Sequence, residues 1–350
     1  MILPSRHFGI LPSGGQATLY SLVNQHGLKA ELTDFGAVLV SLRVPDIRGE
    51  LADITLGYDD ATSYKHHFGA TVGRFAGPIA AGRCLIDGVP LQLGLNGGTY
   101  HIHGGAYGFH KQLWSAEPQN GTDGPAIRFH RLSPDGEEGY PGNLQVSVIY
   151  TLTHRNELRL DYAARTDQPT LCNLTNHSYF NLGGHQSGPI LDHQVQFGAN
   201  TYNLNDADII ATGSVATAKG TPFDFRKPMS VGARIDSGYD QLRLCHGYDH
   251  NYLLPKTENS ELRIAATITD PKSGRKMEMW TTEPGFQFYT GNSIPEGDQG
   301  KCGAIYGKRH ALCLEAQRAP NWPDMPGLTG ALLRPGETYR QTTLYRFLCS

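Results

Sequence analysis

Apolar and polar residues alternate with a period of two wherever a pattern can be read in this sequence. Between residues 144 and 166, two such stretches flank the short break His154-Arg155-Asn156, and each stretch places its apolar side chains on one face. Because successive side chains of a β-strand point to opposite faces, this pattern is typical of half-buried strands. The region therefore predicts a β-hairpin with one buried side and one solvated side.

Two further regions carry the same signal. Residues 261–282 alternate on both sides of the turn sequence DPKSGR, and residues 18–36 have the pattern of strand, turn and strand. No long stretch has the 3.6-residue period of an amphipathic helix, and only residues 61–67 could form a short one. We therefore predict an all-β fold, a large antiparallel β-sandwich with few short helices, in one domain over residues 1–350.

Composition excludes several classes of partner. The formal net charge is −3 without a basic cluster, which argues against binding to nucleic acid. No run approaches 18 apolar residues, and no charged leader precedes an apolar stretch, so we expect neither a membrane span nor a signal peptide. The six cysteines include no C-x-x-C pair, which suits reduced thiols. We expect a soluble cytoplasmic protein.

A first candidate site is the segment NGGTYHIHGGAYGFHKQLW, residues 96–114. On a strand, His101 and His103 would project from the same face and could bind a metal ion. A third ligand of the cupin type is missing, because Tyr107 and Gly108 stand where a glutamate would be needed. We expect no metal there. Since the adjoining glycines let a substrate come close, we expect His103 to face a ligand.

A second candidate is the segment LTNHSYFNLGG, which begins at Leu174. On a strand, Thr175, His177, Tyr179 and Asn181 would share one face. Such a row is rich in hydrogen-bond donors and acceptors, as a sugar-binding surface requires. A solvated sheet face would have the same pattern, so the row alone does not decide between the two.

The third candidate is the segment HALCLEAQRAPNWPD, residues 310–324. Alternation places Ala311, Cys313, Glu315 and Gln317 on one face of an expected strand. Small neighbours around Glu315 would leave room for a ligand. An ordinary surface carboxylate is the alternative interpretation.

Nine segments, in this order, resemble the aldose 1-epimerase (galactose mutarotase) family. They are GRFAG (73–77), HGGAYGFHKQLW (103–114), DGEEGYPGNL (135–144), TNHSYFNLGG (175–184), GYDHNYLL (247–254), EPGFQFYTGN (283–292), CLEAQ (313–317), NWPD (321–324) and LLRPGETY (332–339). The resemblance implies a sandwich of the galactose mutarotase type. It also implies interconversion of the α and β anomers of a free aldohexose, galactose or glucose.

The resemblance assigns roles to particular residues. It implies that Glu315 is the base, that His177 is the acid and that His103 lies against the sugar and helps to polarise it. Asp249 and Gln287 would bind sugar hydroxyls, and neither a metal nor an organic cofactor would be needed. Near neutral pH an ordinary glutamate is ionised and an ordinary histidine is partly protonated, so we expect both groups to need little tuning.

One family segment departs from its pattern. The family reads G-R-x-x-N-R-I, and its second arginine contacts the sugar, whereas Gly77 and Pro78 occupy those Asn and Arg positions here. The lost contact would lower sugar affinity roughly 10- to 100-fold. Arg74 or Arg83 could reach the sugar instead, and we include Arg74 among the expected substrate-binding residues.

Other functions stay open on the sequence. A non-catalytic sugar-binding or sensing domain would fit the changed Gly77-Pro78 positions, and a hexose 6-phosphate 1-epimerase would need arginines that converge on the phosphate. A glycosidase would use the paired carboxylates Glu137 and Glu138, but their glycine-rich surroundings favour a solvated turn. We expect a monosaccharide as the partner and a monomer or homodimer in solution.

Overall fold

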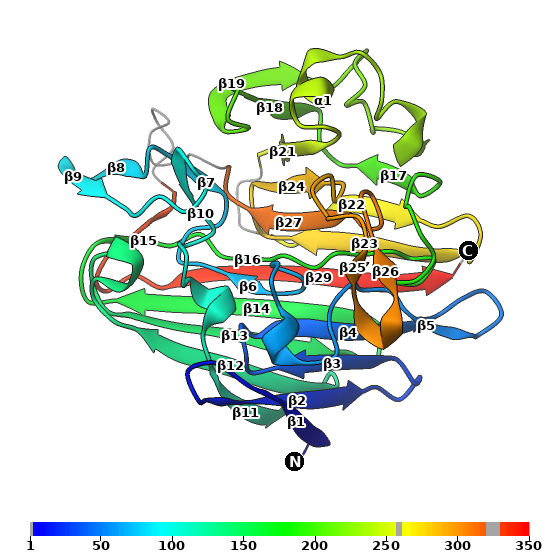
Figure 1. Cartoon of the computed structure of the whole chain (residues 1–350), viewed down its shortest axis with the longest axis horizontal. Helices are drawn as coiled ribbons and strands as arrows, with labels where there is room; N and C mark the ends of the chain where they lie inside the picture. The colour runs from blue at the N-terminus through cyan, green and yellow to red at the C-terminus, as the bar shows by residue number, and fades with distance from the viewer. Residues whose placement is uncertain (1–2, 257–260, 320–329, 350) are drawn as a thin grey trace.

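The largest sheet in the computed structural model is antiparallel and crosses the whole molecule (Figure 1). The structure describes residues 3–256, 261–319 and 330–349. The sheet has nine strands, in the order β11 (Ser115–Asn120), β12 (Pro125–Ser133), β13 (Leu144–Leu152), β14 (Glu157–Thr166), β29 (Tyr339–Cys349), β23 (Arg275–Thr281), β22 (Arg263–Thr269), β17 (Gln194–Phe197) and β20 (Met229–Ser230).

Two five-stranded sheets pack against the nine-stranded one. The N-terminal sheet runs in chain order through β1 (Ser5–Ile10), β2 (Gln16–Val23), β3 (Lys29–Thr33), β4 (Val38–Pro45) and β5 (Leu51–Asp53). The second has the order β19 (Ala211–Thr217), β18 (Thr201–Asn205), β21 (Asp249–Leu253), β24 (Gly285–Tyr289) and β27 (Cys313–Gln317).

Short strands pair at the edges, and the helices are short. The pairs are β6 (Thr71–Val72) with β16 (Thr175–Asn176), β7 (Pro78–Ala80) with β10 (Tyr100–Ile102), β8 (Arg83–Ile86) with β9 (Val89–Gln92), β15 (Thr170–Leu171) with β28 (Leu332–Leu333), and β25 (Asp298–Gln299) with β26 (Ile305–Tyr306). The helices are α1 (Asp240–Leu244) and the 3₁₀ turns η1 (Ala61–Ser63), η2 (Phe109–Lys111), η3 (Glu137–Gly139), η4 (Val231–Ala233) and η5 (Lys301–Gly303).

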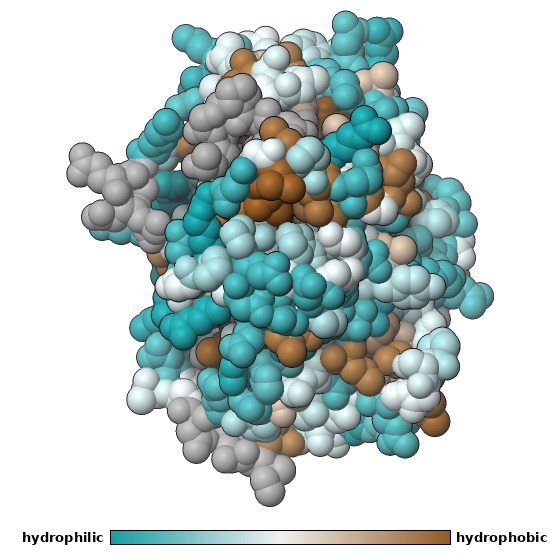
Figure 2. Space-filling model, turned by 90° about the vertical axis from the view of Figure 1, so that its left-hand side faces the viewer, coloured by the Kyte–Doolittle hydropathy of each residue, from teal (hydrophilic) through white to brown (hydrophobic). Residues whose placement is uncertain are grey.

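The all-β prediction is confirmed. The three predicted hairpins form as β2–β3, β13–β14 and β22–β23, and the helical segment near residue 61 is the single turn η1. None of the helices within the described ranges is long and apolar enough to span a membrane. The side of the molecule that carries β8 and β9 is mostly hydrophilic, with separate apolar groups between the polar ones (Figure 2).

One hydrophobic cluster joins the three large sheets. It includes Leu42 from the N-terminal sheet, Val148 and Leu160 from the nine-stranded sheet, and Phe288 and Leu314 from the second five-stranded sheet. Each of these side chains is at most 1% exposed. Burial of this apolar surface is the main force that holds the layers together, as in other β-sandwiches.

The core also fixes which face of β24 and β27 looks outward. Phe288 and Leu314 pair across these two strands and point into the cluster. Because side chains alternate along a strand, Gln287 and Glu315, which are also a cross-strand pair, point to the opposite face. A polar row is thereby held on a rigid sheet directly above the core.

Candidate active site

Five of the predicted site residues line one pocket of about 360 Å³. They are His103, His177, Asp249, Gln287 and Glu315. The pocket opens on the outward face of β21, β24 and β27, and segments distant in sequence close its other walls. The fold therefore brings together residues that the sequence places more than 200 positions apart.

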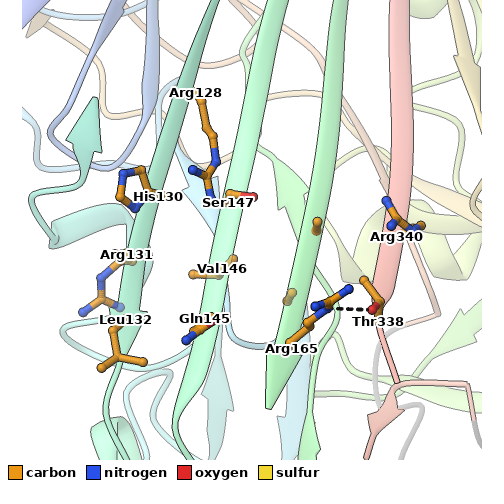
Figure 3. A pocket seen from close by; sticks show the side chains of 12 residues that line it. Arg128, His130, Arg131, Leu132, Gln145, Val146, Ser147, Arg165, Thr338 and Arg340 are labelled. Carbon is orange, nitrogen blue, oxygen red and sulfur yellow. Dashed lines mark hydrogen bonds between the residues drawn. The ribbon is translucent and has the colours of Figure 1, made fainter. Parts of the chain in front are cut away.

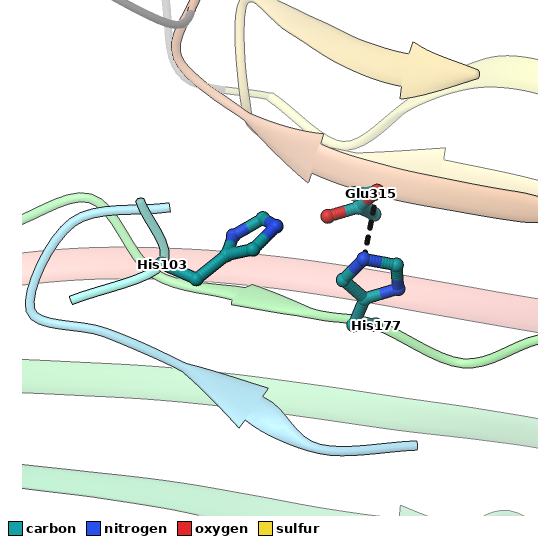
Figure 4. A group of neighbouring side chains, drawn as sticks. All are labelled: His103, His177 and Glu315. Atoms are coloured by element: carbon teal, nitrogen blue, oxygen red, sulfur yellow. Dashed lines mark ion pairs between the residues drawn. The ribbon is translucent and has the colours of Figure 1, made fainter. Parts of the chain in front are cut away.

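Glu315 lies on β27 and is 3% exposed. Its Oε1 atom is 3.6 Å from Nε2 of His177, and its Oε2 atom has no hydrogen-bond partner among the described residues (Figure 4). Burial, and then the negative charge of Asp249, raise the pKa of Glu315 well above its ordinary value. Cys313 and Gln317 share its side of β27, as the alternation of the sequence predicts.

His177 is held by the backbone rather than by a long strand. Its N–H donates to the carbonyl of Ala70, and its carbonyl accepts from the N–H of Gly69, both at 2.9 Å. The imidazole stacks on Tyr179 with 5.0 Å between ring centroids. Burial, and then the charge of neighbouring His67, lower the pKa of His177 well below its ordinary value. These contacts fix the ring beside Glu315.

The predicted row of Thr175, His177, Tyr179 and Asn181 holds only in part, because His177 and Tyr179 both line the pocket and Asn181 does not. The strand β16 ends at Asn176, and the following residues leave the regular alternation. Asn181 turns away and donates to the carbonyls of Gly188 and His310. Hydrogen bonds to neighbouring segments replace the regular strand ladder here, so the alternation cannot continue.

His103 and His101 do not share a face. His101 is buried, and its ring bonds the carbonyl of Gly94 and the hydroxyl of Tyr140. His103 follows the end of β10 and has a left-handed backbone with φ 53°, which breaks the alternation. The Gly77 N–H donates to Nδ1 of His103 (3.3 Å), and this leaves Nε2 available to a ligand.

The three groups in Figure 4 are also the described residues best placed to hold a metal ion. One ligand atom from each of His103, His177 and Glu315 lies within 4.8 Å of the other two. Two imidazoles and a carboxylate form a set that zinc accepts. That the site works without a metal ion remains a prediction.

Asp249 and Gln287 form a hydrogen-bonded pair on neighbouring strands β21 and β24. The Nε2 atom of Gln287 donates to Oδ1 of Asp249 (2.6 Å), and Oε1 of Gln287 is buried without a partner in the described parts of the chain. Burial raises the pKa of Asp249 to about 6, against the opposing effect of the Gln287 hydrogen bond. The pair presents unsatisfied acceptor atoms to the pocket.

The burial of Glu315 and His177 corrects the expectation that the pKa values of both groups stay close to their ordinary values. Each group is shifted toward its neutral form, because charged groups lose hydration when they are buried. The pKa of Glu315 therefore rises, whereas the pKa of His177 falls.

Arg74 is not part of the pocket, contrary to the expectation. Its side chain is 1% exposed, and its guanidinium donates to Ser133 and to the carbonyls of Pro134 and Pro141. It thus holds the turn that contains Glu137 and Glu138, neither of which lines the pocket.

Arg83 does not reach the pocket either. It lies on β8, is exposed, and donates to the side chain of Gln92 on β9. Gly77 and Pro78, in contrast, both line the pocket. Neither lysine nor arginine does so within the described ranges, which exclude the NWPD segment at 321–324.

His67 is a pocket residue that the sequence reasoning missed. Its ring centroid lies 4.8 Å from that of His103 and 5.7 Å from that of His177. Behind it, His110 lies at 4.3 Å. Burial, then the charges of Lys111 and His66, lower the pKa of His67 to about 4, so its imidazole is neutral at physiological pH. In the sequence, the adjacent histidines His66 and His67 were the feature that could have identified this pocket residue.

Comparisons with known proteins identify the family of this chain. Residues 18–346 match the family model described as aldose 1-epimerase. The chain is 43% identical to a mouse galactose mutarotase over 346 residues, which cover 97% of each chain. It is 34% identical to an Escherichia coli K12 aldose 1-epimerase over 344 residues, again 97% of each.

Solved structures have the same fold. A galactose 1-epimerase from Lactobacillus acidophilus superimposes with a TM-score of 0.86 at 27% identity and covers 100% of both chains. A GalM/aldose epimerase homologue from C. elegans gives a TM-score of 0.85 at 27% identity, with coverage of 95% of this chain and 98% of that one. This chain belongs to the aldose 1-epimerase family.

Proposed function

We propose that this protein is an aldose 1-epimerase, an isomerase that interconverts the α and β anomers of free aldohexoses of the galactose and glucose type. The observation that carries the proposal is that Oε1 of Glu315 and Nε2 of His177 lie 3.6 Å apart and that both residues line the same pocket. A carboxyl group and an imidazole at this distance can act on two neighbouring oxygen atoms of one substrate.

The reaction needs one base and one acid at the anomeric centre. Glu315 takes the proton of the O1 hydroxyl while His177 gives a proton to the ring oxygen, and the C1–O5 bond breaks to leave an open-chain aldehyde. Rotation about C1–C2 presents the other face of the aldehyde, and reclosure returns both protons. Each such proton transfer typically contributes about 10²- to 10⁴-fold to the rate.

The opposite pKa shifts fit this cycle. Proton transfer from the carboxyl of Glu315 to the imidazole of His177 changes neither the total charge nor the number of protons. The pair therefore holds one shared proton over the pH range between its two titrations, and its apparent pKa values belong to the pair. One proton per pair is what the catalytic cycle requires at its start and at its end.

The remaining pocket residues supply substrate binding. Asp249 and Gln287 accept and donate hydrogen bonds to sugar hydroxyls, and Nε2 of His103 lies against the reacting end of the sugar. The absence of lysine and arginine from the described lining favours a free sugar over a hexose 6-phosphate, since a phosphate would need cationic partners.

We assign to His67 the hydrogen bond that the family's arginine would otherwise make. Pro78 has no donor, and Arg74 and Arg83 are directed elsewhere. The neutral ring of His67 offers one donor and one acceptor to a hydroxyl group. A neutral donor binds more weakly than a guanidinium, so we expect modest sugar affinity.

Polarimetry tests the proposal. Freshly dissolved α-galactose should reach rotational equilibrium faster with the protein than without it, and Glu315→Gln should remove most of the gain. Glu278→Gln is a suitable control, because Glu278 lies on β23 and does not line the pocket. A wild-type protein that binds galactose without accelerating equilibration would instead identify a sugar-binding or sensing domain.

The free cysteines of the chain support a proposal about its cellular location. The six cysteines are all free, and four of them are buried, as in proteins of reducing compartments. We propose a cytoplasmic location and a monomer or homodimer.

A further inference from the structure

A second hollow lies on the nine-stranded sheet. It measures about 450 Å³ and lies over β12, β13, β14 and β29, and it shares no described lining residue with the sugar pocket (Figure 3). Its lining, as far as the structure describes the chain, includes four arginines and a histidine but no aspartate or glutamate. This is a local concentration of positive charge in a chain whose formal net charge is −3.

Side-chain size creates the hollow. His130, Ser147, Ala163 and Arg340 pair in register across the four strands and form one row. With strands about 4.8 Å apart, the row is roughly 14 Å long. Ser147 and Ala163 in the middle are short, whereas His130 and Arg340 at the ends are long. The sheet therefore presents a shallow floor between two walls of longer side chains, one on β12 and one on β14 and β29.

The wall on β12 is already neutralised. Arg128 and His130 both bond the carboxylate of Glu117, at 3.0 and 2.9 Å. Arg131 pairs with Glu137 at 2.6 Å. These three side chains thus have counter-charges within the protein.

The wall on β14 and β29 is different. Neither Arg165 nor Arg340 pairs with a carboxylate of the described residues, and Nε of Arg165 donates only to the Thr338 hydroxyl (2.9 Å). The nearest carboxylate in the register, Asp161, bonds Arg159 through both oxygens and also accepts from Thr342. It is therefore engaged and does not serve as the counter-ion.

Register places the two unpaired arginines close together. Arg340 is opposite Ala163, and Arg165 is two residues further along the same face of β14. Diagonal neighbours of this kind have Cα atoms about 7–8 Å apart. Both side chains carry a positive charge on the same face of the sheet, and a dianion between them reduces their mutual repulsion. Their planar forks match phosphate oxygens.

We propose that Arg165, Arg340 and the Thr338 hydroxyl bind the phosphoryl group of a phosphorylated small molecule, whose remainder lies on the Ser147–Ala163 floor. The chemistry that this site recognises is the phosphate dianion, either free or esterified. The proposal does not depend on the epimerase activity, because the site and the sugar pocket have separate linings.

Isothermal titration calorimetry of the full chain tests the site. Inorganic phosphate and glucose 6-phosphate are titrated at low ionic strength with saturating galactose, which occupies the sugar pocket. We expect both to bind. Tighter binding of glucose 6-phosphate would identify an esterified ligand that uses the floor, and equal binding would identify free phosphate.

The decisive variant is Arg165→Ala/Arg340→Ala, which should lower the affinity for phosphate at least 10-fold. Arg226→Ala/Lys272→Ala removes the same charge from exposed ion pairs elsewhere and should retain wild-type affinity. Circular dichroism confirms that both variants fold. Equal affinity of the wild type and the arginine variant would overturn the proposal, as would no binding by the wild type or displacement of phosphate by galactose.

Discussion

Nε2 of His177 lies 3.6 Å from Oε1 of Glu315, although Glu315 belongs to a five-stranded sheet and His177 follows a strand of another sheet. Glu315 is fixed by the regular strand β27, whereas His177 is fixed by backbone hydrogen bonds just beyond the two-residue strand β16. Both are nearly fully buried. The consequence is an acid–base pair whose titration is governed by burial, and this leads to a prediction about pH.

The value of kcat/KM for galactose should fall as the pH is lowered through about 6. This limb belongs to Asp249, whose pKa is raised to about 6, because protonation removes its ability to accept strongly from sugar hydroxyls. The pKa of His177 is lowered and that of Glu315 is raised, mainly by burial, and the Asp249→Asn variant separates the titration of this pair from that of Asp249.

The control for the pH profile is Asp249→Asn. This variant should have a higher KM, and its kcat/KM should not fall as the pH is lowered through about 6. Initial rates from polarimetry over pH 4–9 would check both curves. A variant that keeps the limb would assign it to another group, and this would count against the role of Asp249.

Pro78→Arg should lower KM for galactose by about 10-fold while kcat changes little. Pro78 lines the pocket, and a hydrogen bond to a charged group contributes about 1.5–3 kcal/mol. Pro90→Arg adds the same charge on the exposed β8–β9 hairpin, outside the pocket, and should leave KM unchanged. An unchanged or raised KM in Pro78→Arg would show that a side chain at this position does not reach the sugar.

His67→Phe should raise KM about 2- to 10-fold, because it keeps a ring but removes one neutral hydrogen bond of about 0.5–1.5 kcal/mol. The matched control is His110→Phe, which makes the same change behind the pocket lining. A panel of deoxygalactoses identifies the contacted hydroxyl, since the sugar that lacks it should be insensitive to His67→Phe. Equal KM values in the two proteins for galactose would remove His67 from the binding site.

Dialysis against a metal chelator should leave the epimerase activity unchanged. The proposed cycle moves protons between Glu315, His177 and the sugar, and none of its steps requires a Lewis acid. Added zinc should inhibit, because it would occupy the ligand set formed with His103. Activity that is lost on chelation and restored by zinc would show instead that the metal is part of the catalyst.

The regular strands were predictable because their signal is local. In β27 the alternation places Leu314 in the core and Glu315 in the pocket, as expected from the sequence alone. The same reasoning failed around His101 and Asn181, where strands of only two or three residues end and a positive φ or distant hydrogen bonds reorient the side chains. Nothing in the residue pattern marks where a short strand stops.

Arg74 illustrates a second reason for failure. Its position close to the altered Gly77-Pro78 pair suggested a role at the sugar, but four hydrogen bonds hold it on the turn at 133–141 and a fifth joins it to Thr170. A buried guanidinium is stable only where its donors are satisfied, and those partners lie 59–96 residues away in sequence. His67 was missed for the converse reason, because only the fold brings it beside His103 and His177.

By itself, the sequence determined the all-β class, the hairpins, the family resemblance and five residues of the pocket, since alternation and motif identity are properties of short stretches. The tertiary structure alone decided that Glu315 and His177 face each other, that Arg74 is excluded, that His67 is included and that two arginines lie unpaired on the large sheet. Distances between segments and the loss of hydration depend on how the sheets pack, and packing is a property of the whole chain.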